Sequence, residues 1–215
     1  VAFISGGKEY GVIIAPKHLA FNDTEINRTG VSVFMTEQQA RENELRGTQA
    51  AIEDAGALGV MTAFNRVGIT AANAHTGLLK NILRGEWGFK GLESQDFIMN
   101  PNYAVLKEYA LNGGTMTTFT GENTMAAVSE KFAYWTTENV GQDTELMSAI
   151  KQAMTWQAYA LANSNALDGM ASSTRLVSVR TWYDNALRCR AGRFAALTVL
   201  AAAMYVLNDR KSKKQ

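Results

Sequence analysis

Cysteine and histidine are scarce in this sequence, and each scarcity excludes a class of site. Cys189 is the only cysteine, so the 215-residue chain cannot form an internal disulfide bond. Two histidines are too few for a histidine-rich metal centre, and we expect neither a metal site nor another cofactor. A formal net charge of +1 gives no electrostatic reason to expect nucleic-acid binding. The sequence also lacks phosphate-binding loops, serine-hydrolase elbows and zinc-protease motifs.

Apolar runs alternate with helical patterns along most of the chain. This alternation predicts an α/β fold with a parallel sheet. Thr36 and Gln39 form a capping-box pattern at the start of one helix, and Gly56 ends it. The expected strands are Tyr10–Ala20, Leu58–Phe64, Gly91–Asp96 and Thr115–Thr120. The expected helices are Thr36–Asp54, a segment around Leu79, Asn102–Leu111 and Thr144–Ala162, the last burying Leu146, Met147, Ile150, Met154 and Leu161.

Asp96 stands at the end of an expected strand, after the segment GEWGFKGLESQ. A carboxylate at the C-terminal end of a parallel strand is where barrel enzymes hold catalytic groups. The same position also suits a residue that caps the next helix. Position alone leaves both interpretations open.

Several motifs occur together in one order. MTAFNR ends one strand, LRGEWGFKG precedes another, and SQDF contains Asp96. PKHLA followed by NDTEINR occurs earlier, and NSNALDG occurs later. Together these motifs, from Gly11 to Gly169, resemble glycoside hydrolase family 3, in particular the C-terminal half of the catalytic barrel in members that place the barrel last.

The resemblance implies a partial (β/α)8 TIM-type barrel followed by a helical tail. A complete barrel takes about 250 residues, and only four strand–helix units are readable here. The chain begins with Val1 and shows no signal peptide, so we expect a fragment whose N-terminal domains are missing. The expected organisation is a barrel part at 1–170, a linker at 171–185 and a hydrophobic helix with a basic tail at 186–215.

The resemblance also implies roles for individual residues. Asp96 is the expected nucleophile of a retaining exo-β-glycosidase, most simply a β-glucosidase acting on β-glucosides or oligosaccharides. The acid/base carboxyl group is expected from a missing domain, so the isolated chain should be inactive. The expected substrate-binding residues are Lys17, His18, Arg28, Met61 and Phe64.

Two of these residues have alternative interpretations. His18 could be a core histidine, and Arg28 could pair with Asp23 or Glu25 instead of serving the site.

Three positions depart from the family pattern. Many members have tyrosine at the position of Phe64, whose ring cannot donate a hydrogen bond to the nucleophile. Glu93 lies in a strand that is usually apolar, where an unpaired charge is costly. Met116 occupies a position where the family often has aspartate. A non-catalytic barrel remnant that binds sugar or is tethered to a membrane is therefore the rival hypothesis.

The tail has a different composition. Residues 194–207 form an apolar run interrupted only by Thr198, with arginines before it and basic residues after it. Fourteen helical residues cover about 21 Å, against about 30 Å for a bilayer core. We expect a membrane anchor, with the basic end cytoplasmic and the catalytic part outside the cell. The alternative is a packed helix in a cytoplasmic protein.

Overall fold

The computed structural model describes residues 1–28, 30–97, 105–118, 133, 135–168, 170, 174–175, 177 and 181–212, with residues 206–212 described as backbone only. The chain divides into two compact units, Val1–Gly169 and Met170–Gln215. Each unit is described separately.

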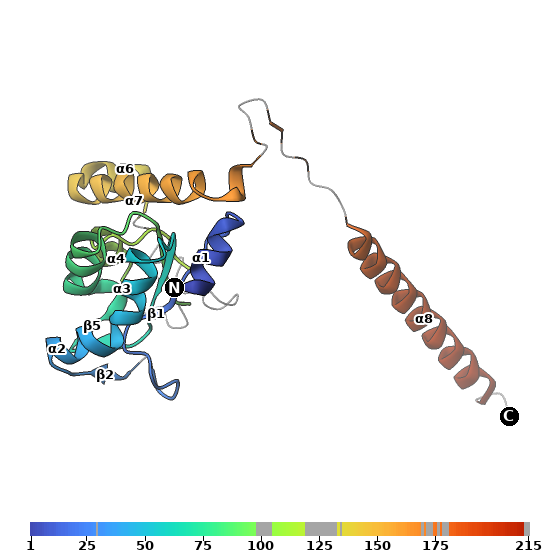
Figure 1. Cartoon of the computed structure of the whole chain (residues 1–215). Coiled ribbons are helices and arrows are strands. Elements are labelled where there is room, and N and C mark those ends of the chain that lie inside the picture. Colours follow the sequence, from blue (N-terminus) through green and yellow to red (C-terminus); the bar gives the residue numbers. More distant parts are fainter. Residues whose placement is uncertain are drawn as a thin grey trace. The chain divides into compact units, whose positions relative to one another are not determined.

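A parallel sheet forms the centre of the first unit (Figure 1). Its strands are β1 (Lys17–Leu19), β3 (Gly59–Thr62) and β6 (Leu92–Gln95), in the order β1-β3-β6. A parallel bridge between Ser94 and Met116 continues this order on the far side of β6. Parallel strands separated by helices confirm the α/β class, whereas the partial barrel stays a prediction.

A second, smaller sheet lies in the same unit. It consists of β2 (Ser32–Val33), β4 (Arg66–Val67) and β5 (Thr70–Ala71). β4 and β5 form an antiparallel hairpin, and the turn between them places Gly68 at a φ of 60°, a conformation that favours glycine.

Helical segments connect and cover the strands. Two of them, η1 and η3, are π-helical. The segments are α1 (Ala2–Glu9), α2 (Glu37–Gln39), η1 (Ala40–Glu44), α3 (Arg46–Glu53), η2 (Ala72–Ala74), η3 (Gly77–Glu86), α4 (Leu106–Leu111), α6 (Thr137–Gln142), α7 (Thr144–Ala162) and η5 (Asn165–Leu167).

The predicted start and end of the helix after Thr36 are confirmed. Thr36 and Gln39 form a complete capping box, and Gly56 follows the helical region with a φ of 62°. The prediction of one continuous helix over Thr36–Asp54 is wrong. The Leu45 amide donates to the Ala40 carbonyl, five residues back, so a π-helical turn separates α2 from α3.

The expected strands are shorter in the structure. The first is restricted to β1, because Pro16 has no N–H for the ladder and serves only as an acceptor for the Met61 amide. The fourth is represented by the single bridge at Met116, and residues 119 and 120 lie outside the described residues. Helix α4 begins at Leu106, whereas its predicted start at Asn102 is not among the described residues.

Helix α7 has the predicted bounds but buries a different face. Its buried residues are Leu146, Ala153 and Ala160, seven residues apart, while Met154 is 63% exposed. Helix α7 contacts α4, α6, η5 and β6, so several neighbouring elements cover this face. Of the predicted core stripe, Leu146 is buried and Met147 and Ile150 are partly buried, whereas the prediction is wrong for Met154 and Leu161, which are exposed.

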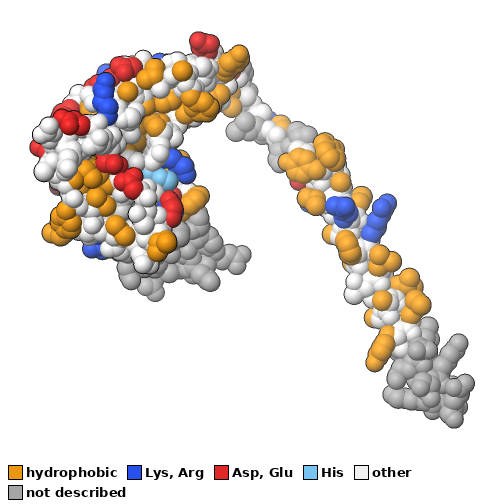
Figure 2. Space-filling model, turned by 60° about the horizontal axis from the view of Figure 1, so that its bottom comes forward, with side chains coloured by type: hydrophobic (Ala, Val, Ile, Leu, Met, Phe, Trp, Pro, Cys, Tyr) orange, Lys and Arg blue, Asp and Glu red, His pale blue; other side chains and the backbone are white. Residues whose placement is uncertain are grey.

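The second unit contains one long helix, α8 (Trp182–Ser212), which begins inside the segment expected to be a linker. Large apolar side chains along it are exposed (Figure 2). Within the described residues, the structure contains no helix with the length and hydropathy needed to cross a membrane.

Candidate active site

Asp96 directly follows β6, at the C-terminal edge of the parallel sheet. Its side chain is buried, and both its backbone amide and one carboxylate oxygen form hydrogen bonds with backbone groups. The Asp96 amide donates to the Thr62 carbonyl at 3.0 Å, and the Asp96 Oδ1 accepts the Phe97 amide at 2.8 Å. The alternative role as a helix cap concerns residues 98–104, which are not described.

Two side chains from distant segments converge on the other carboxylate oxygen. The His18 Nε2 and the Arg28 guanidinium each lie 3.2 Å from the Asp96 Oδ2. His18 comes from β1, and Arg28 from the loop after it. Because parallel strands end at the same sheet edge, residues 78 positions apart in sequence (96 − 18) become neighbours.

Burial lowers the pKa of His18 below its ordinary value of 6.5. The negative charge of Asp96 opposes this shift, while the positive charges of Lys17 and Arg28 add to it. His18 is therefore neutral at neutral pH and can donate one N–H while accepting at its other ring nitrogen.

Arg28 has partners on several sides. It lies 3.2 Å from the Glu25 Oε2 as well as from Asp96, and its guanidinium carbon stands 4.7 Å from the centre of the Phe64 ring. The predicted ion pair of Arg28 with Glu25 is confirmed, and its role in substrate binding stays a prediction. Phe64 cannot donate to the carboxylate, but its ring face supports the arginine that does.

Lys17 and Met61 lie beside this group. Met61, in β3, pairs in register with Lys17 and with Ser94. Lys17 is exposed and Met61 partly buried. Within the described residues, no hydrogen bond or ion pair joins either side chain to Asp96. Of the six predicted site residues, the structure thus brings four into direct contact: Asp96, His18, Arg28 and Phe64.

The sequence interpretation gave no role to Asn22. The Asn22 Nδ2 lies 3.3 Å from the His18 Nδ1 and 3.1 Å from the Glu25 Oε1. The only signal in the sequence was the regular spacing of Asn22, Glu25 and Arg28 in NDTEINR, three residues apart.

Glu93 lies three residues before Asp96 and is completely buried. The Thr62 hydroxyl donates to its Oε1 at 2.6 Å, while its Oε2 has no hydrogen-bond partner among the described residues. Burial raises the pKa of Glu93 to about 7, more than the Thr62 hydrogen bond and the Arg84 charge lower it. The departure from the family pattern thus places a carboxyl group with a pKa of about 7 inside β6, the strand that Asp96 follows.

Arg84, from η3, fixes the backbone around β6. Its guanidinium donates to the carbonyls of Phe89, Gly91 and Gly113 at 2.7–3.1 Å and lies 3.8 Å from the centre of the Trp156 ring. Burial lowers its pKa to about 10, so it remains charged at neutral pH. Arg84 thereby ties the segments before β6 and before Met116 to one helix.

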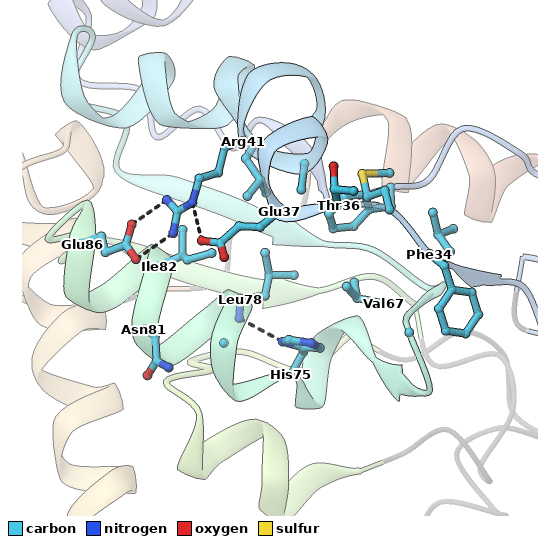
Figure 3. A pocket seen from close by; sticks show the side chains of 17 residues that line it. Phe34, Thr36, Glu37, Arg41, Val67, His75, Leu78, Asn81, Ile82 and Glu86 are labelled. Carbon is cyan, nitrogen blue, oxygen red and sulfur yellow. Dashed lines mark hydrogen bonds and ion pairs between the residues drawn. The ribbon is translucent and has the colours of Figure 1, made fainter.

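A well-lined apolar pocket lies elsewhere in the same unit. It has a volume of about 460 Å³ and lies between the small sheet and the helices α2, η1 and η3. Figure 3 shows Arg41 between Glu37 and Glu86, His75 beneath Leu78, and Phe34 away from that ion-pair cluster. The residues that line the pocket do not include Asp96, His18 or Arg28.

Among the described residues, no group of three histidine, cysteine, aspartate or glutamate side chains is arranged to hold a metal ion. The chemistry available at Asp96 is that of a buried carboxylate held by a neutral histidine and an arginine. Such a carboxylate can act as a nucleophile or stabilise a cationic centre.

Proteins with similar sequences include two from Emericella nidulans. Probable beta-glucosidase J is 40% identical over 96 residues, covering 45% of this chain and 11% of that protein. Beta-glucosidase B is 41% identical over 95 residues, covering 44% and 11%. The aligned region is thus about a tenth of the length of these relatives.

Solved structures with a similar fold are also β-glucosidases. Beta-glucosidase 3B from Thermotoga neapolitana, in complex with glycerol, has a TM-score of 0.65 at 23% identity, over 81% of this chain and 24% of that one. DesR from Streptomyces venezuelae, in complex with D-glucose, has a TM-score of 0.62 at 22% identity, over 81% and 22%. At these identities the likeness establishes the fold.

The family model for the glycosyl hydrolase family 3 N-terminal domain matches residues 1–116. Those residues include β1, β3, β6 and all four contacting site residues. Since the match covers more than half of the 215 residues, the chain belongs to glycosyl hydrolase family 3.

Proposed function

We propose that this chain carries the nucleophile of a retaining exo-β-glycosidase that hydrolyses terminal β-glucosides, with Asp96 as the nucleophile. One observation carries the proposal: the buried carboxylate at the end of β6 receives His18 and Arg28 on one oxygen and a backbone amide on the other. Such a carboxylate is fixed in place before the substrate binds.

In this mechanism, an oxygen of Asp96 attacks the anomeric carbon, and the glycosidic bond breaks to give a covalent glycosyl-enzyme. A second carboxyl group protonates the leaving oxygen and then activates water. We assign this acid/base to another domain. We assign Lys17 to hydrogen bonds with sugar hydroxyls, and Met61 and Phe64 to contacts with the sugar. Both ring nitrogens of His18 already have partners in Asn22 and Asp96, so His18 serves the substrate through the carboxylate that it orients.

We also propose that the sheet is the C-terminal half of a TIM-type barrel, in a protein that places the barrel after its other domains. The order β1-β3-β6 followed by the bridge at Met116 supports this arrangement, because the segments of this sheet lie side by side in the order in which they occur in the sequence. A half-barrel needs the rest of the protein to supply the remaining strands and the acid/base carboxyl group.

Covalent labelling tests the proposed function. The longest natural polypeptide that contains this chain is incubated with an activated 2-fluoro glucoside, which slows the second step and traps the adduct. Tandem mass spectrometry, which separates Asp96 from Glu93 on the same peptide, should find the label on Asp96. The isolated 215-residue chain should remain unlabelled. Label on Glu93 would overturn the assignment, and sugar binding without any label would support the non-catalytic alternative.

For the tail, we propose that α8 associates with a membrane surface. Phe194, Leu197 and Leu200 are between 57% and 71% exposed in a helix that also carries basic residues near its end. Burying these side chains in the lipid interface would remove apolar surface from water.

We expect a reporter fused to residues 186–215 to sediment with membranes. Replacing Leu197 and Leu200 together by glutamate should release it, whereas replacing the neighbouring Thr198 by serine should not. A wild-type fusion that stays entirely in the soluble fraction would indicate a packed helix instead.

A further inference from the structure

We propose that Asn22 and Glu25 are positioning residues that fix which nitrogen of His18 carries the proton and hold Arg28, so that both groups donate to the Asp96 carboxylate. The contacts are read directly from the structure. Only their consequence for turnover rests on the proposed function.

The contacts form a closed ring of polar groups. The His18 Nε2 and the Arg28 guanidinium each lie 3.2 Å from the Asp96 Oδ2. On the far side of the imidazole, the Asn22 Nδ2 lies 3.3 Å from the His18 Nδ1. Glu25 closes the ring, because its Oε1 accepts from Asn22 at 3.1 Å and its Oε2 lies 3.2 Å from Arg28.

The donors and acceptors of this ring leave one tautomer. The Asn22 Nδ2 can only donate, so the His18 Nδ1 must accept. A carboxylate can only accept, so the His18 Nε2 must carry the proton that points at Asp96. The orientation of the Asn22 amide is fixed in turn, because its Nδ2 faces two acceptors, the His18 ring nitrogen and the Glu25 oxygen.

Glu25 contributes more by connecting two hydrogen-bond donors than by its charge. Its side chain is 70% exposed, so its ion pair with Arg28 is screened by water. Its two oxygens nevertheless join the donors of Asn22 and Arg28, which fixes the loop between these residues. The ionisable groups that act on His18 are Asp96, Lys17, Arg28 and Glu25.

If the ring is broken, the imidazole loses its fixed proton position. With no donor at Nδ1, only the Asp96 carboxylate favours the Nε2–H tautomer, so the fraction of the other tautomer, whose bare Nε2 directs a lone pair at the carboxylate, rises. Asp96 would then lose one of the two side chains that hold its Oδ2. In the proposed reaction, this misorients the nucleophile without removing it.

Nitrogen-15 NMR of the imidazole rings in the purified 215-residue chain tests the inference without any turnover. At pH 8, the wild-type His18 should show a protonated Nε2 and an unprotonated Nδ1. Asn22→Asp supplies an acceptor at Nδ1, so both ring nitrogens then face carboxylates, and the fraction of His18 with a proton on Nδ1 should rise, including the doubly protonated ring. The pKa of His18 should rise by about one unit or more, since a nearby opposite charge favours the imidazolium.

Asn22→Leu is the matched variant of similar size that offers neither donor nor acceptor, and it should raise the fraction of the Nδ1–H tautomer above that of the wild type without raising the pKa of His18. His75 is the internal reference. Its Nδ1 accepts the Leu78 amide at 3.0 Å, far from this ring in sequence, so its signals should stay the same in every sample and report that the chain is folded.

A wild-type His18 protonated on Nδ1 would overturn the inference, as would an unchanged His18 spectrum in both Asn22 variants. Glu25→Ala changes an exposed side chain and should fold normally. It should still lower the fraction of the Nε2–H tautomer, and no change would contradict the role given to Glu25. If His18 shows the expected tautomer but the full protein never forms a glycosyl-enzyme, the proposed function is refuted and the inference about Asn22 and Glu25 stands.

Discussion

Asp96→Asn should abolish turnover by the full polypeptide, lowering kcat by about 10⁴- to 10⁶-fold, as expected when a nucleophile is removed. The amide has the shape of the carboxylate and keeps one acceptor oxygen for His18 and Arg28. It cannot form the glycosyl ester. Steady-state hydrolysis of a nitrophenyl β-glucoside measures the loss.

Two further variants serve as comparisons for this result. Asp54→Asn changes an exposed carboxylate after α3 and should leave kcat unchanged. Lys17→Ala should lower kcat/KM by about 10- to 100-fold, the effect of one charge-assisted hydrogen bond to the sugar. An Asp96→Asn enzyme that keeps a tenth of its activity would show that another group is the nucleophile.

Glu93→Gln should remove most of the pH dependence of folding stability between pH 5 and pH 8. Burial raises the pKa of Glu93 from 4.5 to about 7. Below pH 4.5 the carboxyl is neutral in both folded and unfolded chains, and no penalty exists. As the pH rises towards 7, the unfolded chain ionises first, so the folded state loses roughly 3 kcal/mol relative to it.

Denaturant unfolding of the 215-residue chain at the two pH values measures this difference. The wild type should be less stable at pH 8 than at pH 5, and Glu93→Gln should reduce that gap by about 2.5 kcal/mol, because the unfolded chain is already partly ionised at pH 5. Glu53→Gln, on the exposed side of α3, should leave it unchanged. His18 acts with the opposite sign, because its lowered pKa destabilises the folded state as the pH falls below 6.5. A gap of equal size in Glu93→Gln would assign the dependence to other groups.

Local sequence signals predicted those features that depend on neighbouring residues. The capping box at Thr36 occurs as expected, since its hydrogen bonds join residues three apart. Helix α7 has the expected bounds and a cap on Asp143, whose side chain accepts the Leu146 amide. The alternation of apolar runs with helical patterns gave the α/β class. The family motifs identified the segments around His18 and Asp96.

Features that depend on distant segments required the tertiary structure. The elements that pack against α7 select its buried face, so Ala153 is buried whereas the neighbouring Met154 is exposed, and the sequence of α7 alone does not predict this. The strand expected over Tyr10–Ala20 is reduced to β1, because a strand exists only where its neighbour offers matching donors and acceptors.

The sequence by itself determined the family, the fold class and the segments that contribute to the site. Only the tertiary structure decided that Arg28 serves both Glu25 and Asp96, that Phe64 supports Arg28, and that Asn22 completes the ring around His18. The physical reason is that hydrogen bonds and ring contacts depend on distances of 3–5 Å between side chains up to 78 positions apart (96 − 18). Those distances are set by the shared edge of the parallel sheet, and no local pattern encodes them.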